Sequence, residues 1–326
     1  MSNKDLFYEV LPEFTRETEA LCAEEMPRYH GNRLVSSTWL ITMLKEGGPG
    51  VHERHIQRKR DIKKTKYMTF GQVGEDIVQG RSILIPEEGD YDERRATYRI
   101  QQHTGRSKIG KEEIAAAEAD GIHLLPKDLA VPLERGTFAA MQSREVQCFN
   151  KYLTQQPIYR REANPGSPWP NLPGIQARPD WAGMIPECPE NDHYSGKLVF
   201  ADLKTTSSIA EFPRTFIKNN YHVQAGMVRI CSGTENLPFV VHAFPVIERS
   251  EPNDVYTFYP DEELIQTGIK IAKSLLSLLD RMFESNHFGA RPLSPVISAK
   301  SAPWVSRDAD NISSLVDQLL TTYDLA

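Results

Sequence analysis

Apolar residues recur at the helical spacing of three and four positions along several stretches of this 326-residue chain. The clearest stretch is 261–283, where leucines and isoleucines predict a long amphipathic helix. The same spacing, helped by capping serines and by glycines at the ends, predicts further helices. They cover residues 14–26, 37–45, 70–80, 110–120, 127–153 (interrupted by Pro132), 212–228 and 311–325.

Short runs of apolar and β-branched residues, bounded by turn residues, predict strands. They cover residues 158–162, 174–181, 197–206, 239–247 and 254–259. Helices precede, interrupt and follow these strands, which is typical of an α/β fold with a mixed central β-sheet flanked by helices and a helical N-terminal region. We divide the chain into a helical arm (1–28), one large domain (29–295) and a tail rich in proline and serine (296–326).

Two acids and a lysine lie at the ends of these predicted strands. Asp180 closes the strand 174–181, and Asp202 and Lys204 are two apart in the strand 197–206. Residues two apart on a strand share a face, so Leu203 is expected to pack behind them. Two converging carboxylates bind Mg²⁺ through oxygen, and a lysine beside them can orient or deprotonate water. The alternative is a solvated D-x-K tripeptide without function.

Tyr221 and Gln224 are three apart on the predicted helix and share one of its faces. The chain therefore carries R-P-D at 178–180, D-L-K-T-T at 202–206 and Y-H-V-Q at 221–224. This order resembles the PD-(D/E)xK nucleases, and specifically the RecE-type exonucleases (exodeoxyribonuclease VIII), relatives of phage lambda exonuclease. The likeness extends to Y-H-G at 29–31, to residues 35–40 and to F-G at 70–71.

The resemblance implies a PD-(D/E)xK nuclease core and a Mg²⁺-dependent exodeoxyribonuclease, with Mn²⁺ as a substitute. The enzyme would digest linear double-stranded DNA from its ends, 5′ to 3′, and leave single strands for recombination by annealing. Its metal ligands would be Asp180, Asp202 and the Leu203 carbonyl, with Lys204 and Gln224 as catalytic residues. A third acid is expected upstream, either Glu162 on the preceding strand or Glu145 on the preceding helix.

Other positions are expected near the metal or the DNA. The family often has a histidine four residues after the glycine of its early helix, where this chain has Glu75. Glu75 is therefore either a group near the metal or a solvated helix residue. Thr205 and Thr206 also fit the start of a helix, where the free backbone N–H groups favour the binding of anions. The residues expected to contact DNA are Tyr221, Thr205, Thr206, Arg178, Lys63 and Lys64.

The resemblance further implies a closed ring of three or four chains around the duplex and a single-strand annealing protein as partner. It places the protein in the bacterial cytoplasm, encoded by a phage or prophage. One rival is a catalytically silent DNA-end-binding or recombination-assembly protein, against which the intact Asp180, Asp202 and Lys204 weigh. The other is an endonuclease on the same core, which would need a module that reads base edges.

Composition and charge bear on which of these classes of protein the chain can belong to. The net charge of −6 and pI near 5.9 exclude a generally basic surface. The basic runs at 54–66 and 94–111 are either solvated helix faces or the lining of a DNA channel. The four cysteines form no C-x-x-C pair and no late cluster, so we expect neither zinc nor an iron–sulfur cluster. No stretch approaches the ~20 apolar residues of a membrane span, and the N-terminus does not resemble a signal peptide.

Overall fold

The computed structural model describes residues 34–58, 65–85, 96–103, 107–162, 164, 166–187 and 193–288. The predicted helices at 14–26 and 311–325 lie outside these residues, as do Lys63 and Lys64. None of the described helices combines the length and the apolar character that crossing a membrane requires.

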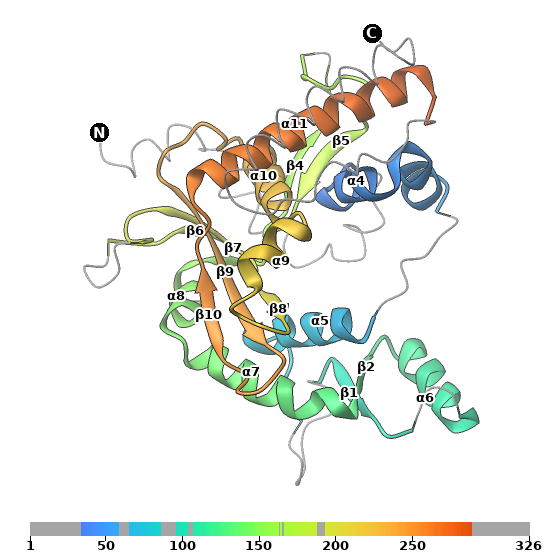
Figure 1. The fold of residues 1–326 in the computed structure, drawn as a ribbon, viewed down its shortest axis with the longest axis vertical. Helices are drawn as coiled ribbons and strands as arrows, with labels where there is room; N and C mark the ends of the chain where they lie inside the picture. The colour runs from blue at the N-terminus through green and yellow to red at the C-terminus, as the bar shows by residue number, and fades with distance from the viewer. Residues whose placement is uncertain are drawn as a thin grey trace.

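A mixed sheet forms the centre of the structure (Figure 1). Its strands follow the order β10-β9-β7-β6-β3, and β8 pairs with the far end of β9. β7 and β8 run parallel to β9, and the remaining pairs are antiparallel. The strands are β3 (Thr154–Gln155), β6 (Trp181–Met184), β7 (Leu198–Ala201), β8 (Lys204–Thr206), β9 (Val240–Glu248) and β10 (Val255–Phe258). Two small sheets pair β1 (Tyr98–Gln101) with β2 (His123–Pro126), and β4 (Tyr159–Glu162) with β5 (Gly174–Ala177).

Helices cover both faces of the central sheet, which confirms the predicted mixed α/β fold (Figure 1). Leu198 and Phe200 of β7 pack in one core with the helices α4, α10 and α11. Val199 and Ala201 point the other way, into a second core with α5, α7 and α8. This is the alternation of a strand buried on both faces. The helices are α4 (Ser37–Val51), α5 (Lys66–Val78), α6 (Lys108–Ala119), α7 (Ala130–Gln142), α8 (Arg144–Tyr152), α9 (Phe212–Lys218), α10 (Tyr221–Ser232) and α11 (Glu262–Ser285), with short turns of π-helix (His52–Ile56) and 3₁₀-helix (Lys127–Leu129).

Several predicted boundaries differ from the structure. The predicted strand 174–181 is divided between β5 and β6, because Arg178-Pro179-Asp180 separates them and proline cannot donate to a ladder. The predicted helix 212–228 is divided between α9 and α10, since Asn220 has a left-handed backbone (φ +60°). Thr205 and Thr206 belong to β8, so the helix start expected there is wrong. The short strands β1, β2 and β3 were not predicted.

The helices α10 and α11 cross at two glycines. An added Cβ on Gly268 of α11 would overlap the carbonyl oxygen of His222, and one on Gly226 of α10 would lie 2.5 Å from the Gly268 carbonyl carbon. The missing side chains therefore let the two backbones touch. This close approach matters for the site, because α10 also carries Tyr221 and Gln224.

We expect Gly268→Ala to lower the free energy of unfolding by about 1–3 kcal/mol or more, because overpacking forces the helices apart. Urea unfolding measures the change. The matched control is Gly71→Ala in α5, where the added Cβ would meet Thr205 at 3.9 Å, an ordinary contact. There alanine should stabilise the helix by up to about 1 kcal/mol. A Gly268→Ala protein as stable as the parent would contradict the packing.

Candidate active site

Asp202 and Leu203 lie at a short break between β7 and β8. The register to β9 continues across this break, from Ala201 opposite Ala243 to Lys204 opposite Val246. The Asp202 N–H donates to the Ala243 carbonyl over 3.1 Å. Because the alternation is kept, Asp202 and Lys204 share a face, and the Lys204 Nζ contacts the Asp202 Oδ2. Leu203 packs into the core on the other side, as predicted.

Asp180 lies beside this break, at the start of β6. Its Oδ2 accepts a hydrogen bond from the Leu203 N–H over 2.6 Å. Its main-chain carbonyl accepts from the Gln156 N–H (2.8 Å) and from the Gln79 Nε2 (3.0 Å). Asp180 is anchored through both its side chain and its main chain, and it is only 5% exposed. The predicted convergence of Asp180 with the D-L-K segment is present in the structure.

Gln224 and Tyr221 reach the same point from α10. The Gln224 Nε2 lies 3.3 and 3.5 Å from the two Asp202 oxygens, and its Oε1 accepts from the Lys204 Nζ over 3.2 Å. The Tyr221 ring centroid is 4.6 Å from the Lys204 Nζ. Residues three apart on the helix therefore hold the lysine between an amide and an aromatic face, in line with the predicted shared face.

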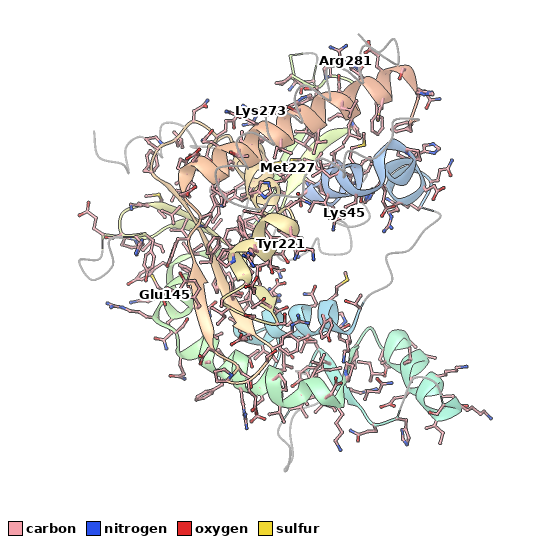
Figure 2. The ribbon with its side chains drawn as sticks, in the orientation of Figure 1. Lys45, Glu145, Tyr221, Met227, Lys273 and Arg281 are labelled. Carbon is pink, nitrogen blue, oxygen red and sulfur yellow. The ribbon has the colours of Figure 1, made fainter. Side chains whose placement is uncertain are left out.

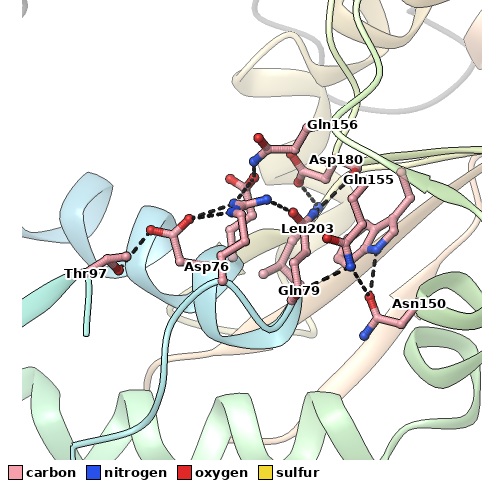
Figure 3. A network of polar contacts seen from close by, with 11 residues as sticks. Asp76, Gln79, Thr97, Asn150, Gln155, Gln156, Asp180 and Leu203 are labelled. Carbon is pink, nitrogen blue, oxygen red and sulfur yellow. Dashed lines mark hydrogen bonds and ion pairs between the residues drawn. The ribbon is translucent and has the colours of Figure 1, made fainter. Parts of the chain in front are cut away.

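Glu75 belongs to α5, next to Asp76, and contacts Gln156; Figure 3 shows Asp76 and Gln156 in the polar network around Asp180. The Glu75 Oε1 accepts from the Gln156 Nε2 over 2.5 Å and from the Arg81 Nη2 over 3.0 Å. Arg81 also donates to Asp76 at 2.7 and 3.1 Å, which extends the network outward. Glu75 is 9% exposed, so its interpretation as a solvated helix residue is wrong.

The site holds its charged groups at an energetic cost. Burial and the nearby Glu75 carboxylate raise the pKa of Asp180 to about 7, against the opposing effects of Lys204, Arg178 and the Leu203 N–H. Burial lowers the pKa of Lys204 to about 8, although Asp180 and Glu75 oppose this shift. Both shifts have the same cause, because a low-dielectric environment penalises the charged form of either group.

The donor set fits a hard divalent cation. Asp180, Asp202 and the Leu203 carbonyl offer oxygen only, which is the ligand chemistry of Mg²⁺. A cation at these oxygens would offset the repulsion from Glu75, which together with burial raises the pKa of Asp180. Among the described residues, no three His, Cys, Asp or Glu side chains gather as a metal-holding cluster. The fit therefore rests on the Asp180–Asp202 pair, with Glu75 engaged by Arg81 and Gln156.

The expected third acid does not join this pair. Glu162 lies opposite Gly174, whereas Tyr159, at the other end of β4, lies opposite Ala177 near Asp180. Its side chain is exposed on the small β4–β5 sheet, so the structure does not bring it to the site. Glu145 is on α8, away from Tyr221 (Figure 2). Glu162 fails because the register between β4 and β5, which spacing alone did not give, decides which end of β4 lies near Asp180.

The residues expected to contact DNA differ in their burial and in their contacts. Arg178 is half-buried and acts electrostatically on Asp180. Thr205 faces Gly71 of α5, while the buried Thr206 hydroxyl exchanges hydrogen bonds with the Ser208 backbone. Described members of the two basic runs pair with acids, which favours solvated faces: Arg54 with Glu46, Lys66 with Asp128, Arg99 with Asp120 and Lys108 with Glu112.

Sequence reasoning missed the polar residues that support the acids. Gln156 bonds to both Asp180 and Glu75, Gln79 holds the Asp180 carbonyl, and Arg81 neutralises Glu75 and Asp76. They come from the end of α5 and from the segment after β3. No spacing rule relates such separate segments, and only the tertiary arrangement reveals them.

No protein-family model matches the chain, and no curated protein matches it. Among solved structures, a "putative exonuclease" from Eubacterium rectale superposes with a TM-score of 0.49 at 10% identity, over 83% of this chain and 88% of that one. The structure of SSO0001 superposes with a TM-score of 0.31 at 12% identity, over 81% and 86% of the two chains. At these scores, neither likeness bears on activity.

The buried Asp180 carboxyl predicts a pH-dependent stability for the metal-free protein. Its folded pKa is raised from 3.8 to about 7, so its ionisation increasingly destabilises the fold as the pH rises through that interval. Asp180→Asn removes this penalty and keeps an acceptor for the Leu203 N–H. We expect the variant to gain stability relative to the parent between pH 4 and pH 8, on the order of 1–4 kcal/mol.

Urea unfolding in chelator at the two pH values measures this gain. The matched control is Asp254→Asn, because the Asp254 side chain is exposed and should show no pH-dependent gain. Added Mg²⁺ at pH 8 should stabilise the parent and the control but not Asp180→Asn. An equal response of all three proteins would argue against a cation at Asp180.

Proposed function

We propose that this chain is a Mg²⁺-dependent nuclease that digests linear double-stranded DNA from its ends. The observation that carries the proposal is the convergence of Asp180, Asp202, Lys204 and Gln224 at one buried point. A structural ion pair would not need the buried Glu75 carboxylate nearby, which together with burial raises the pKa of Asp180.

Each residue has a distinct task in this proposal. Asp180 and Asp202 would hold Mg²⁺, with the Leu203 carbonyl. Bound Mg²⁺ would supply positive charge for the phosphodiester and make water more acidic. Lys204 is held by Asp202, Gln224 and Tyr221, so its Nζ has a fixed direction. With a pKa lowered to about 8, this Nζ can accept or give a proton near neutral pH.

The support around the acids is equally specific. Gln224 bonds to both Asp202 and Lys204, so it couples the orientation of the carboxylate to that of the amine. Gln156 joins the main chain of Asp180 to the side chain of Glu75. Such contacts around a metal site orient its ligands and are typically needed for full affinity.

We expect Asp202→Asn and Lys204→Ala each to reduce cleavage of linear duplex by about 10²-fold or more, since each removes a group that acts on the reacting phosphate or water. The assay uses duplexes labelled at the 5′ or the 3′ end, with Mg²⁺ and with chelator. A covalently closed circle of the same sequence separates end digestion from internal cutting.

The controls are Asp254→Asn and Lys270→Ala, which change the same residue types at exposed positions. Both should cut at the parent rate. Cleavage by purified Asp202→Asn or Lys204→Ala at the parent rate would refute the site. Binding of DNA ends by the parent without any Mg²⁺-dependent cleavage would instead identify a silent end-binding protein, and cutting of the closed circle would identify an endonuclease.

Glu75 should tune the metal requirement. Its carboxylate adds negative charge beside Asp180, and Gln can keep the acceptor that Arg81 and Gln156 use. We expect Glu75→Gln to raise the Mg²⁺ concentration for half-maximal cleavage about 10-fold. The Mg²⁺ titration is made at pH 8.5, where Asp180 is ionised in both proteins. Any difference then reports the lost attraction between the Glu75 carboxylate and Mg²⁺. The control is Glu145→Gln, and a Glu75→Gln curve that overlays it would contradict the assignment.

Four further properties stay predictions of the family resemblance. They are the 5′ to 3′ direction, the substitution of Mn²⁺ for Mg²⁺, the ring of three or four chains and the single-strand annealing partner. In the two basic runs, Arg54, Lys66 and Arg99 pair with acids of the same chain. The assay with 5′- and 3′-labelled ends bears directly on direction.

A further inference from the structure

A stacked arginine–tyrosine pair lies next to the site. Arg249 follows directly after β9, and its guanidinium carbon is 3.9 Å from the ring centroid of Tyr67. Tyr67 is in the first turn of α5 and is 48% exposed. The Arg249 N–H and Nε both point to the Thr206 carbonyl, at 2.8 and 3.3 Å. The pair therefore joins the exposed end of α5 to the end of β8.

The strand register sets the distance between this pair and the lysine. Lys204 lies opposite Val246, and Arg249 is three residues further along the same strand direction. At about 3.3 Å per residue, the backbone positions of the two residues are about 10 Å apart along the sheet. Tyr221 lies within electrostatic reach of both: Lys204 lies over its ring, and Arg249 opposes the rise in the pKa of Tyr221 that burial causes.

The chemistry of the pair suits a phosphate on a nucleic-acid strand. A guanidinium stacked on an aromatic ring can still bind phosphate oxygens through its planar edge. The Arg249 Nη1 is a buried donor with no acceptor among the described residues, and an unsatisfied buried donor favours an oxygen that can reach it. The Lys66 Nζ also lies over the Tyr67 ring, 5.2 Å from its centroid.

Acidic groups near the pair are already engaged. Glu248 accepts from the Ile209 N–H over 3.0 Å, and Asp128 pairs with Lys66. Arg249 itself forms its described side-chain hydrogen bond with a neutral carbonyl. A phosphate arriving at Arg249 would therefore not have to displace a carboxylate from this guanidinium.

We propose that Arg249, stacked on Tyr67, binds a backbone phosphate of the substrate strand other than the one being cut, and so fixes that strand over Lys204. This inference rests on the proposed nuclease function. It makes Arg249 a substrate-binding residue and Tyr67 a positioning residue that holds the guanidinium plane. The alternative is that the pair only fastens α5 to the sheet.

Binding is measured in the Asp202→Asn background with chelator, by fluorescence anisotropy of an end-labelled linear duplex across a series of NaCl concentrations. We expect Arg249→Ala to weaken binding about 10-fold and to reduce the salt slope by about one phosphate contact. Arg249→Lys should keep the slope but lose part of the affinity, because lysine lacks the planar fork. Tyr67→Ala should weaken binding less than Arg249→Ala.

In the catalytic background, these variants should raise KM more than they lower kcat, since the pair acts on strand binding. The matched control is Arg281→Ala, at the opposite end of α11 from the site (Figure 2), which should leave both the affinity and the salt slope unchanged. Thermal melting of each variant shows whether the fold is kept. If Arg249→Ala melts at a lower temperature than the parent, the same binding measurements on Arg249→Lys and Tyr67→Phe test the proposal instead.

The outcomes separate the two levels of the proposal. Unchanged affinity and salt slope in Arg249→Ala, with a parent that binds and cuts DNA, would overturn the phosphate assignment and leave the nuclease site intact. Lower stability with unchanged salt slope would likewise assign the pair to fastening α5. A parent that neither binds nor cuts linear duplex would overturn the nuclease function, and the phosphate site with it.

Discussion

The hydrogen bond from the Leu203 N–H to the Asp180 carboxylate is the contact on which the site depends. It joins the break between β7 and β8 to the connection between β5 and β6, two segments that pair only beyond this point. Because a buried carboxylate without donors is very costly, the bond fixes both segments at once. The continuous register of β7 and β8 against β9 then determines where Asp202 and Lys204 point.

Burial explains why the site needs so many neutral polar side chains. Asp180 and Lys204 both shift towards their neutral forms, so the site tolerates little net charge without a ligand. Gln79, Gln156 and Gln224 supply donors and acceptors without adding charge. Arg81 compensates Glu75 from the solvent side, where a guanidinium is less costly to hold. The result is a site whose geometry is set before any cation or substrate arrives.

Local periodicity was enough to predict the centre of this site but not its surroundings. The period of two placed Asp202 and Lys204 together, and the spacing of three placed Tyr221 and Gln224 together, because both rules act within one element. The prediction for Glu162 failed because its position depends on two elements, through the register between β4 and β5. β1 was missed because it lies within the basic run 94–111, and β2 and β3 were missed because they show no alternation of apolar and polar residues.

The helix α5 connects the two ends of the proposed machinery. Thr65 caps its N-terminus by accepting from the Met68 N–H, and the buried Phe70 and Val73 fix its face against the core. Tyr67 and Glu75 are eight residues apart, so the helix spans about 12 Å between the arginine stack and the acids. A rigid element of that length keeps the arginine stack and the acids at a constant separation. A shift of α5 would therefore disturb both together, whereas a change in Arg249 alone would leave the acids in place.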